Sequence, residues 1–128
     1  MPWNGVYYNM QHATIDDVNR LADKIEDDWT LCELFKGRRR AKEGEYMVAQ
    51  TIHAARTNAE KRGKPFSFKG AGVEGRGGGG LVDNGTAYAW LLEDEFFVED
   101  KHEGKTVIYP TQTLINALDE FFAGNKGQ

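Results

Sequence analysis

Apolar residues recur at steps of three and four along the first third of the chain, at Ile15, Val18, Ala22, Ile25, Trp29 and Cys32. This spacing is typical of one face of an amphipathic helix. Thr14 precedes the run and can cap its first turn, since a Thr side-chain oxygen accepts a hydrogen bond from a backbone N–H there. The pattern therefore predicts a first helix that begins at Thr14 and ends before Gly37.

Three further helices are expected from the same periodicity. The second covers about residues 45–61, ends at Gly63 and is followed by Pro65, which prevents its resumption. A compact third helix covers residues 87–92. A last helix is capped by Thr111 or Thr113, and its core face carries Leu114, Ile115, Leu118, Phe121 and Phe122.

Alternating apolar runs in the second half of the chain predict two strands. These runs are residues 96–98 and 106–109, and the polar residues 100–105 between them include Gly104. Two such runs joined by a short, glycine-containing segment are typical of a β-hairpin. A shorter alternating run at residues 66–68 is a weaker indication of a strand.

These elements and the length of 128 residues predict a single α+β domain over residues 1–128. The domain is mostly helical, with about four helices, a hairpin in its C-terminal half and a mobile Gly-rich loop over residues 69–80. No apolar run approaches the ~20 residues that span a bilayer, so no membrane association is expected. Cys32 is the only cysteine, which excludes an internal disulfide. We expect a cytoplasmic protein.

The segment TAYAWLLEDEFFVEDKHEGKTVIYPT, residues 86–111, resembles the second half of a winged-helix domain. The resemblance implies a winged-helix-like fold in which the hairpin is the wing. In that family the third helix usually enters the major groove of DNA. Here the outer positions of that helix include Asp83, Glu93 and Asp94, which phosphates would repel. The second helix and the Gly-rich loop are therefore the better candidates for contact with nucleic acid.

The net charge of −4 conceals a strong internal asymmetry. Residues 1–35 have a net charge of −5, residues 36–76 of +7 and residues 77–128 of −6. A basic centre between two acidic flanks is typical of a polyanion-binding surface, although neutralisation of the centre by the flanks within the fold is an alternative. The candidate nucleic-acid contacts are Arg38, Arg39, Arg40, Lys42, Arg56, Lys61, Arg62, Lys64, Lys69 and Arg76.

The Gly-rich stretch has several interpretations. Residues 70–75 match G-x-G-x-x-G, but the glycines that follow cannot sustain the helix that a dinucleotide site requires. Beside the surrounding bases, the same glycines could instead let backbone N–H groups approach phosphates. Phe66 and Phe68 could stack on exposed bases of a single strand. We expect no cofactor, and the stretch is interpreted as a loop that orders on a partner.

A second hypothesis uses the opposite charge. An acidic segment near the C-terminal hairpin could dock on a basic surface of a larger protein, and could mimic nucleic acid as phage or bacterial inhibitors do. Its candidate residues are Glu93, Asp94, Glu95, Phe96, Phe97, Glu99 and Asp100. The three histidines lack a metal-ligand spacing, and no residue pattern favours catalysis, so we expect a non-enzymatic protein without a metal. DNA, RNA and a basic protein surface stay open as partners, as does a homodimer.

Overall fold

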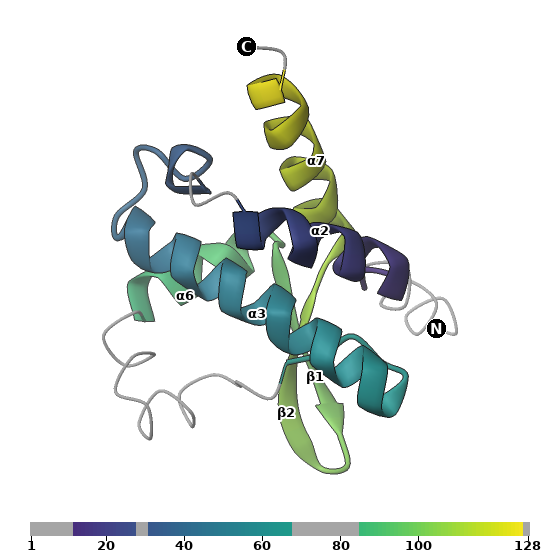
Figure 1. The fold of residues 1–128 in the computed structure, drawn as a ribbon. Helices are drawn as coiled ribbons and strands as arrows, with labels where there is room; N and C mark the ends of the chain where they lie inside the picture. The colour runs from purple at the N-terminus through teal and green to yellow at the C-terminus, as the bar shows by residue number, and fades with distance from the viewer. Residues whose placement is uncertain (1–11, 28–30, 68–84, 127–128) are drawn as a thin grey trace.

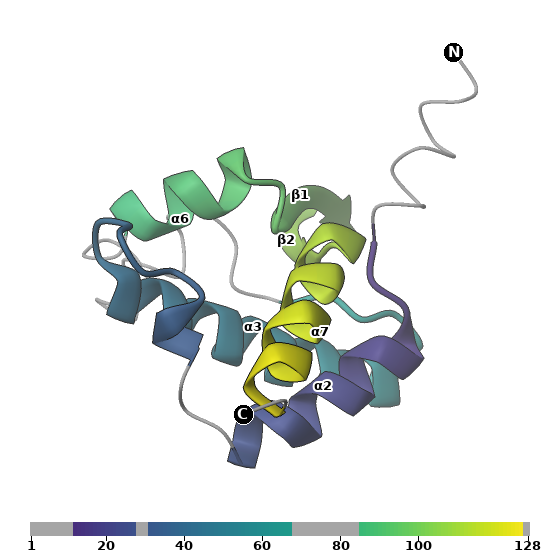
Figure 2. The same ribbon diagram turned by 90° about the horizontal axis from the view of Figure 1, so that it is seen from above.

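The computed structural model describes residues 12–27, 31–67 and 85–126 (Figure 1). Its elements in chain order are α2 (Ile15–Asp27), η1 (Leu31–Glu33), α3 (Ala41–Arg62), α6 (Gly85–Glu93), β1 (Phe97–His102), β2 (Lys105–Pro110) and α7 (Gln112–Lys126). The expected α+β architecture, mostly helical with a hairpin in the C-terminal half, is confirmed. Seen from above, α2 and α3 form one layer, α6 and the hairpin form another, and α7 lies across α2 (Figure 2).

Two helices begin at the predicted threonine caps. The Thr14 Oγ1 accepts a hydrogen bond from the Asp17 N–H at 3.2 Å. The Thr111 Oγ1 accepts one from the Leu114 N–H at 3.1 Å, and the same hydroxyl donates to the Phe96 carbonyl at 3.0 Å. Thr111 therefore caps α7 and also joins its start to the chain that leaves α6.

The first helix is shorter than its apolar pattern predicts. It ends at Asp27, and Leu31–Glu33 forms a separate 3₁₀ turn. Leu31 and Phe35 are nevertheless buried, so the apolar stripe still reaches the core after the helix has ended. Gly37, the predicted stop, has a left-handed φ of 90° and closes this segment.

Helix α3 begins earlier than expected. Arg40 adopts a left-handed conformation (φ 61°) at its N-cap without a side-chain cap, and the helix proceeds from Ala41. The first turn includes Gly44, whose α-carbon lies against the Trp90 ring of α6. The end at Gly63 is as expected, with the Gly63 N–H bonded to the Ala59 carbonyl at 3.0 Å.

The hairpin turn consists of Glu103 (φ 54°) and Gly104 (φ 80°), the two left-handed positions of a type I′ turn. His102 pairs with Lys105 beside this turn, and the antiparallel register continues to the pair of Phe97 with Pro110. On its other side, β2 exchanges backbone hydrogen bonds with Ser67 through Ile108, at 2.7 and 3.2 Å. Residues 66–67 therefore supply a single bridge, and within the described part of the chain β1 pairs only with β2.

The main core brings together side chains from α2, α3, α6, the hairpin and α7, with Leu21, Ile52, Leu91 and Leu118 fully buried. A smaller cluster contains Phe66, Val107 and Tyr109. Phe66 has no exposed surface, so the expectation that it could stack on bases is wrong. Phe68 and the Gly-rich loop of residues 69–80 lie outside the described residues.

Candidate nucleic-acid interface

Helix α3 carries a row of polar side chains, of which Tyr46 and Thr57 are exposed and Gln50 and His53 are half-buried. Tyr46, Gln50, His53 and Thr57 follow one another at steps of four, three and four residues, opposite Val48 and Ile52 in the core. The Tyr46 side chain is 54% exposed, although large aromatic residues usually pack inward. The Gln50 Nε2 donates to the Tyr46 hydroxyl at 2.7 Å. Residues 46–59 contain no Asp or Glu.

Basic side chains stand at both ends of this face. Arg39 and Lys42 lie at its start, and Lys61 and Lys64 lie at its end; all four are exposed. Within the described part of the chain, no ion pair involves any of these four side chains. At a rise of 1.5 Å per residue, Lys42 and Lys61 are separated by about 28 Å along the helix. The predicted basic centre is thus divided between the two ends of α3.

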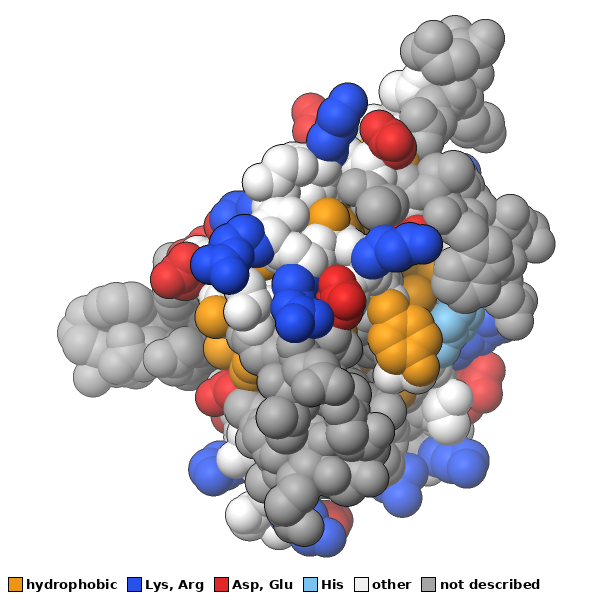
Figure 3. Space-filling model, turned by 90° about the vertical axis from the view of Figure 1, so that its left-hand side faces the viewer, with side chains coloured by type: hydrophobic (Ala, Val, Ile, Leu, Met, Phe, Trp, Pro, Cys, Tyr) orange, Lys and Arg blue, Asp and Glu red, His pale blue; other side chains and the backbone are white. Residues whose placement is uncertain are grey.

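Other predicted contacts are engaged in ion pairs. Arg38 pairs with Asp94 and lies 5.0 Å over the Trp90 ring. Arg40 pairs with Glu43 at 3.4 Å. Such exposed pairs contribute only about 0–1 kcal/mol and can exchange a carboxylate for a phosphate. Figure 3 shows the corresponding pattern on one face, where Lys and Arg side chains are spread out with Asp and Glu beside several of them.

Arg56 and Arg62 support α3 itself. Arg56 bridges Asp23 of α2 at 2.8 Å and Glu60 at 3.8 Å, so it joins two helices of one layer. Arg62 donates to Asn58 at 3.2 Å. The remaining predicted contacts, Lys69 and Arg76, lie outside the described residues.

The alternative acidic site is only partly exposed. Phe97 is 2% exposed and belongs to the core, so its expected place on an interface is wrong. Phe96 is half-buried against the same core. Glu93 is exposed, and Asp94 is held by Arg38. Burial of the two aromatic residues leaves the acids without the apolar anchors that the hypothesis supposed.

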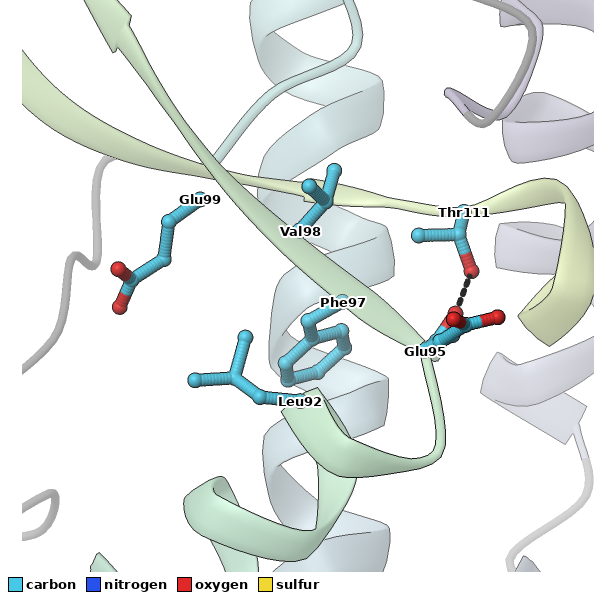
Figure 4. A pocket seen from close by; sticks show the side chains of 6 residues that line it. All are labelled: Leu92, Glu95, Phe97, Val98, Glu99 and Thr111. Carbon is cyan, nitrogen blue, oxygen red and sulfur yellow. Dashed lines mark hydrogen bonds between the residues drawn. The ribbon is translucent and has the colours of Figure 1, made fainter. Parts of the chain in front are cut away.

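Glu95 and Glu99 line a pocket of about 290 Å³ together with Leu92, Phe97, Val98 and Thr111. In Figure 4 the two acidic side chains lie on opposite sides of Phe97 and Leu92. The Tyr88 hydroxyl donates to the Glu99 Oε2 at 2.6 Å, which orients that carboxylate. Asp100 accepts a hydrogen bond from the Lys101 N–H at 2.8 Å.

His12 lies against the hairpin. Its ring stacks on Tyr109 at 3.9 Å, and its Nε2 lies 3.6 Å from the Asp100 carboxylate. Burial lowers the His12 pKa below its usual range, against the opposing attraction of Asp100. Across the described residues, no group of three His, Cys, Asp or Glu side chains is arranged to hold a metal ion. No helix in this part of the chain is both long and apolar enough to cross a membrane.

The polar face of α3 was not among the features predicted from the sequence, although Tyr46, Gln50, His53 and Thr57 recur there at helical spacing. No protein-family model, curated protein or solved structure matches this chain.

Proposed function

We propose that this chain is a non-enzymatic nucleic-acid-binding protein of a regulatory or accessory kind, and that it binds through the exposed face of α3. The observation that supports this proposal is the arrangement of charge on that helix. A polar face without acids lies between two pairs of exposed bases, Arg39 with Lys42 and Lys61 with Lys64. Bases at both ends attract phosphates and position the helix.

The polar side chains between the bases of α3 can contact the nucleic acid that these bases position. Gln50 offers both donors and acceptors, and Tyr46, His53 and Thr57 each offer at least one polar atom. The major groove of duplex DNA is wide enough for an α-helix. At 3.4 Å per base pair, the ~28 Å between Lys42 and Lys61 corresponds to about eight base pairs. We therefore favour duplex DNA as the target over a single strand.

The first test is binding to labelled duplex DNA, single-stranded DNA and RNA over a salt series. Four phosphate contacts predict a slope of log K against log salt of about −3.6, because each contributes about −0.9 on B-DNA. Reversing two charges, Lys42→Glu with Lys61→Glu, should reduce this slope by about 1.8. No binding to any nucleic acid at ~50 mM salt would overturn the proposal.

A matched control variant is available on the hairpin. Lys101→Glu with Lys105→Glu also reverses two exposed lysine charges and leaves α3 intact. If α3 is the contact surface, this variant should retain most of the affinity and the full salt slope. If the hairpin acts as the wing of a winged helix, it should lose affinity as strongly as the α3 variant, and the assignment to α3 would be wrong.

The Tyr46→Ala and Gln50→Ala variants separate positioning from recognition. Loss of a base contact reduces affinity for a preferred sequence more than for other sequences, whereas loss of a phosphate contact weakens binding uniformly. We expect Gln50→Ala to remove a base contact and so to reduce the affinity for the preferred sequence more than the affinity for other sequences. The measurement is a comparison of a selected duplex with a mixed-sequence duplex at one salt concentration.

A further inference from the structure

The outer edge of β1 carries backbone groups that face away from β2. In a hairpin with a two-residue turn, the pair next to the turn, His102 with Lys105, exchanges both backbone hydrogen bonds, and every second pair does so after it. Val98 and Asp100 therefore face β2, whereas Phe97 and Glu99 direct their N–H and C=O groups outward. Ile108 confirms this alternation, because it lies opposite Glu99 and bonds Ser67 on its far side.

No hydrogen bond to the backbone of Phe97 or Glu99 on this outer side is made by another described residue. One step further along the strand, the outward N–H of Lys101 is bonded to the Asp100 carboxylate. Phe97 is only 2% exposed, so its outward backbone groups are covered. Among the described residues, the open part of the edge is therefore Glu99 together with the C=O of Lys101, which offers one N–H donor and two C=O acceptors to an added strand.

Two hollows follow this edge. The pocket of about 290 Å³ adjoins Phe97, Val98 and Glu99, and a second of about 350 Å³ adjoins Glu99, Asp100, Lys101 and Thr106. Glu99 lines both of them. Side chains from an added strand would therefore find space on either side of Glu99, with the apolar Leu92 and Phe97 toward one end (Figure 4).

We propose that the edge of β1 binds an extended, basic peptide segment of a partner protein by strand addition. The charge of the site selects the occupant. Glu95, Glu99 and Asp100 stand along the hollows, and Lys101 is the one basic residue among those that line them. His12 lies beside Asp100, with its Nε2 3.6 Å from that carboxylate. In an antiparallel pairing, partner residues opposite Asp100 and Glu99 would be basic, and the residue opposite the half-buried Val98 would be apolar. This inference is independent of nucleic-acid binding by α3.

Two other occupants fit less well. The same acids repel phosphates, which disfavours nucleic acid at this edge. A second copy of β1 could place Glu99 opposite Lys101, but the two-fold symmetry of that pairing would set Asp100 against Asp100. Directly opposed like charges destabilise a strand pair.

The test uses the full chain and a fluorescein-labelled peptide, TTRRVVT, acetylated and amidated at its ends. Its two arginines would lie opposite Asp100 and Glu99 in the antiparallel register. Two N-methylated forms keep the same side chains. Methyl groups on the second and fourth amides block the N–H groups that face the C=O groups of Lys101 and Glu99, whereas methyl groups on the third and fifth block those that face away.

Strand addition predicts that methylation of the second and fourth amides weakens binding by about tenfold, because two hydrogen bonds are lost. Methylation of the third and fifth should change the affinity by less than about twofold, since it leaves the bonds to β1 in place. Equal losses for the two forms, or no binding of the parent peptide at ~1 mM, would overturn the proposal.

Protein variants test the charge separately from the backbone. Glu99→Gln retains an acceptor for the Tyr88 hydroxyl but removes the charge, and it should weaken binding of TTRRVVT. Glu93→Gln removes an exposed charge at the end of α6, outside the residues that line the two hollows, and should leave the affinity unchanged. Equal effects of both variants would indicate general electrostatic attraction. Self-association that Glu99→Gln abolishes, with no peptide binding, would assign the edge to a second copy.

Discussion

Replacement of Gly44 by alanine tests the close approach of α3 to α6. A β-carbon at this position would lie 2.5 Å from the Cη2 and 2.8 Å from the Cζ2 of Trp90. Carbon atoms in contact are normally about 3.5–4.0 Å apart, so the ring or the helix must move by about 1 Å. Trp90 cannot turn aside cheaply, because its Nε1 donates to the Arg39 carbonyl at 2.8 Å and its ring is 5.2 Å from that of Phe35.

The expected magnitude is a balance of two terms. Gly→Ala in a helix interior normally stabilises by about 1 kcal/mol. Overpacking of a filled core costs about 1–3 kcal/mol. The short contact and the anchored ring place Gly44→Ala near the upper end of that cost, so we expect a net destabilisation of about 1–2 kcal/mol. This change has the opposite sign to the one that helix propensity alone would give.

The assay is urea denaturation followed by far-UV circular dichroism. Gly124→Ala in α7 is the matched control, because its added β-carbon would meet nothing within 4 Å, and it should be neutral or stabilising. The Trp90→Phe background removes the two clashing ring atoms, so Gly44→Ala should no longer destabilise the protein there. The difference between the effects of Gly44→Ala on the free energy of unfolding in the two backgrounds is the coupling energy. If Gly44→Ala alone stabilises the protein as much as the control does, the packing of α3 on α6 described above is wrong.

Three further changes test local features by the same denaturation assay. Glu95→Gly should stabilise by about 1 kcal/mol, because Glu95 occupies the left-handed position (φ 66°) after α6, where a side chain is strained; an unchanged or lower stability would contradict this. Thr111→Val should destabilise by about 1–2 kcal/mol, since it removes the hydroxyl that caps α7 and bonds the Phe96 carbonyl, while Thr113→Val, at an exposed neighbouring position, should have little effect. The lowered pKa of His12 means that the unfolded chain binds its proton more readily, so stability should fall as pH drops below the usual value of 6.5; His12→Phe should reduce that dependence, and an unaltered pH profile would refute it.

The caps and the hairpin could be predicted because their signals are local. Thr14 and Thr111 precede apolar periodicity, and Gly104 lies between two alternating runs; each feature is decided by the geometry of a few neighbouring residues. The start of α3 could not be predicted in this way. Arg40 begins the helix from a left-handed conformation without a side-chain cap, and residues of the preferred capping types are absent there.

The burial and pairing of the candidate site residues depend on tertiary structure, which the sequence pattern does not specify. Phe96 and Phe97 are adjacent, yet only Phe97 is fully buried, because Phe96 lies in the bend before β1 and Phe97 is the first residue of the strand. The bases at the two ends of α3 appear as one basic segment in the chain, but about 28 Å of helix separates Lys42 from Lys61. Which bases are engaged by acids depends on tertiary contacts, as the pair of Arg38 with Asp94 illustrates.

The two proposed surfaces lie on different layers of the fold, and this separation makes their independence testable. The polar face belongs to α3, in the layer with α2, whereas the open edge belongs to β1, in the layer with α6 (Figure 2). We therefore expect a bound peptide to leave the contacts of Lys42 with DNA unchanged. Saturation with TTRRVVT should change the affinity for duplex DNA by less than about threefold, because a coupling of that size corresponds to only ~0.7 kcal/mol. If binding of the peptide instead prevented binding of DNA, the two ligands would compete for one surface or through the charge of the bound peptide. The assignment of two separate sites would then be wrong.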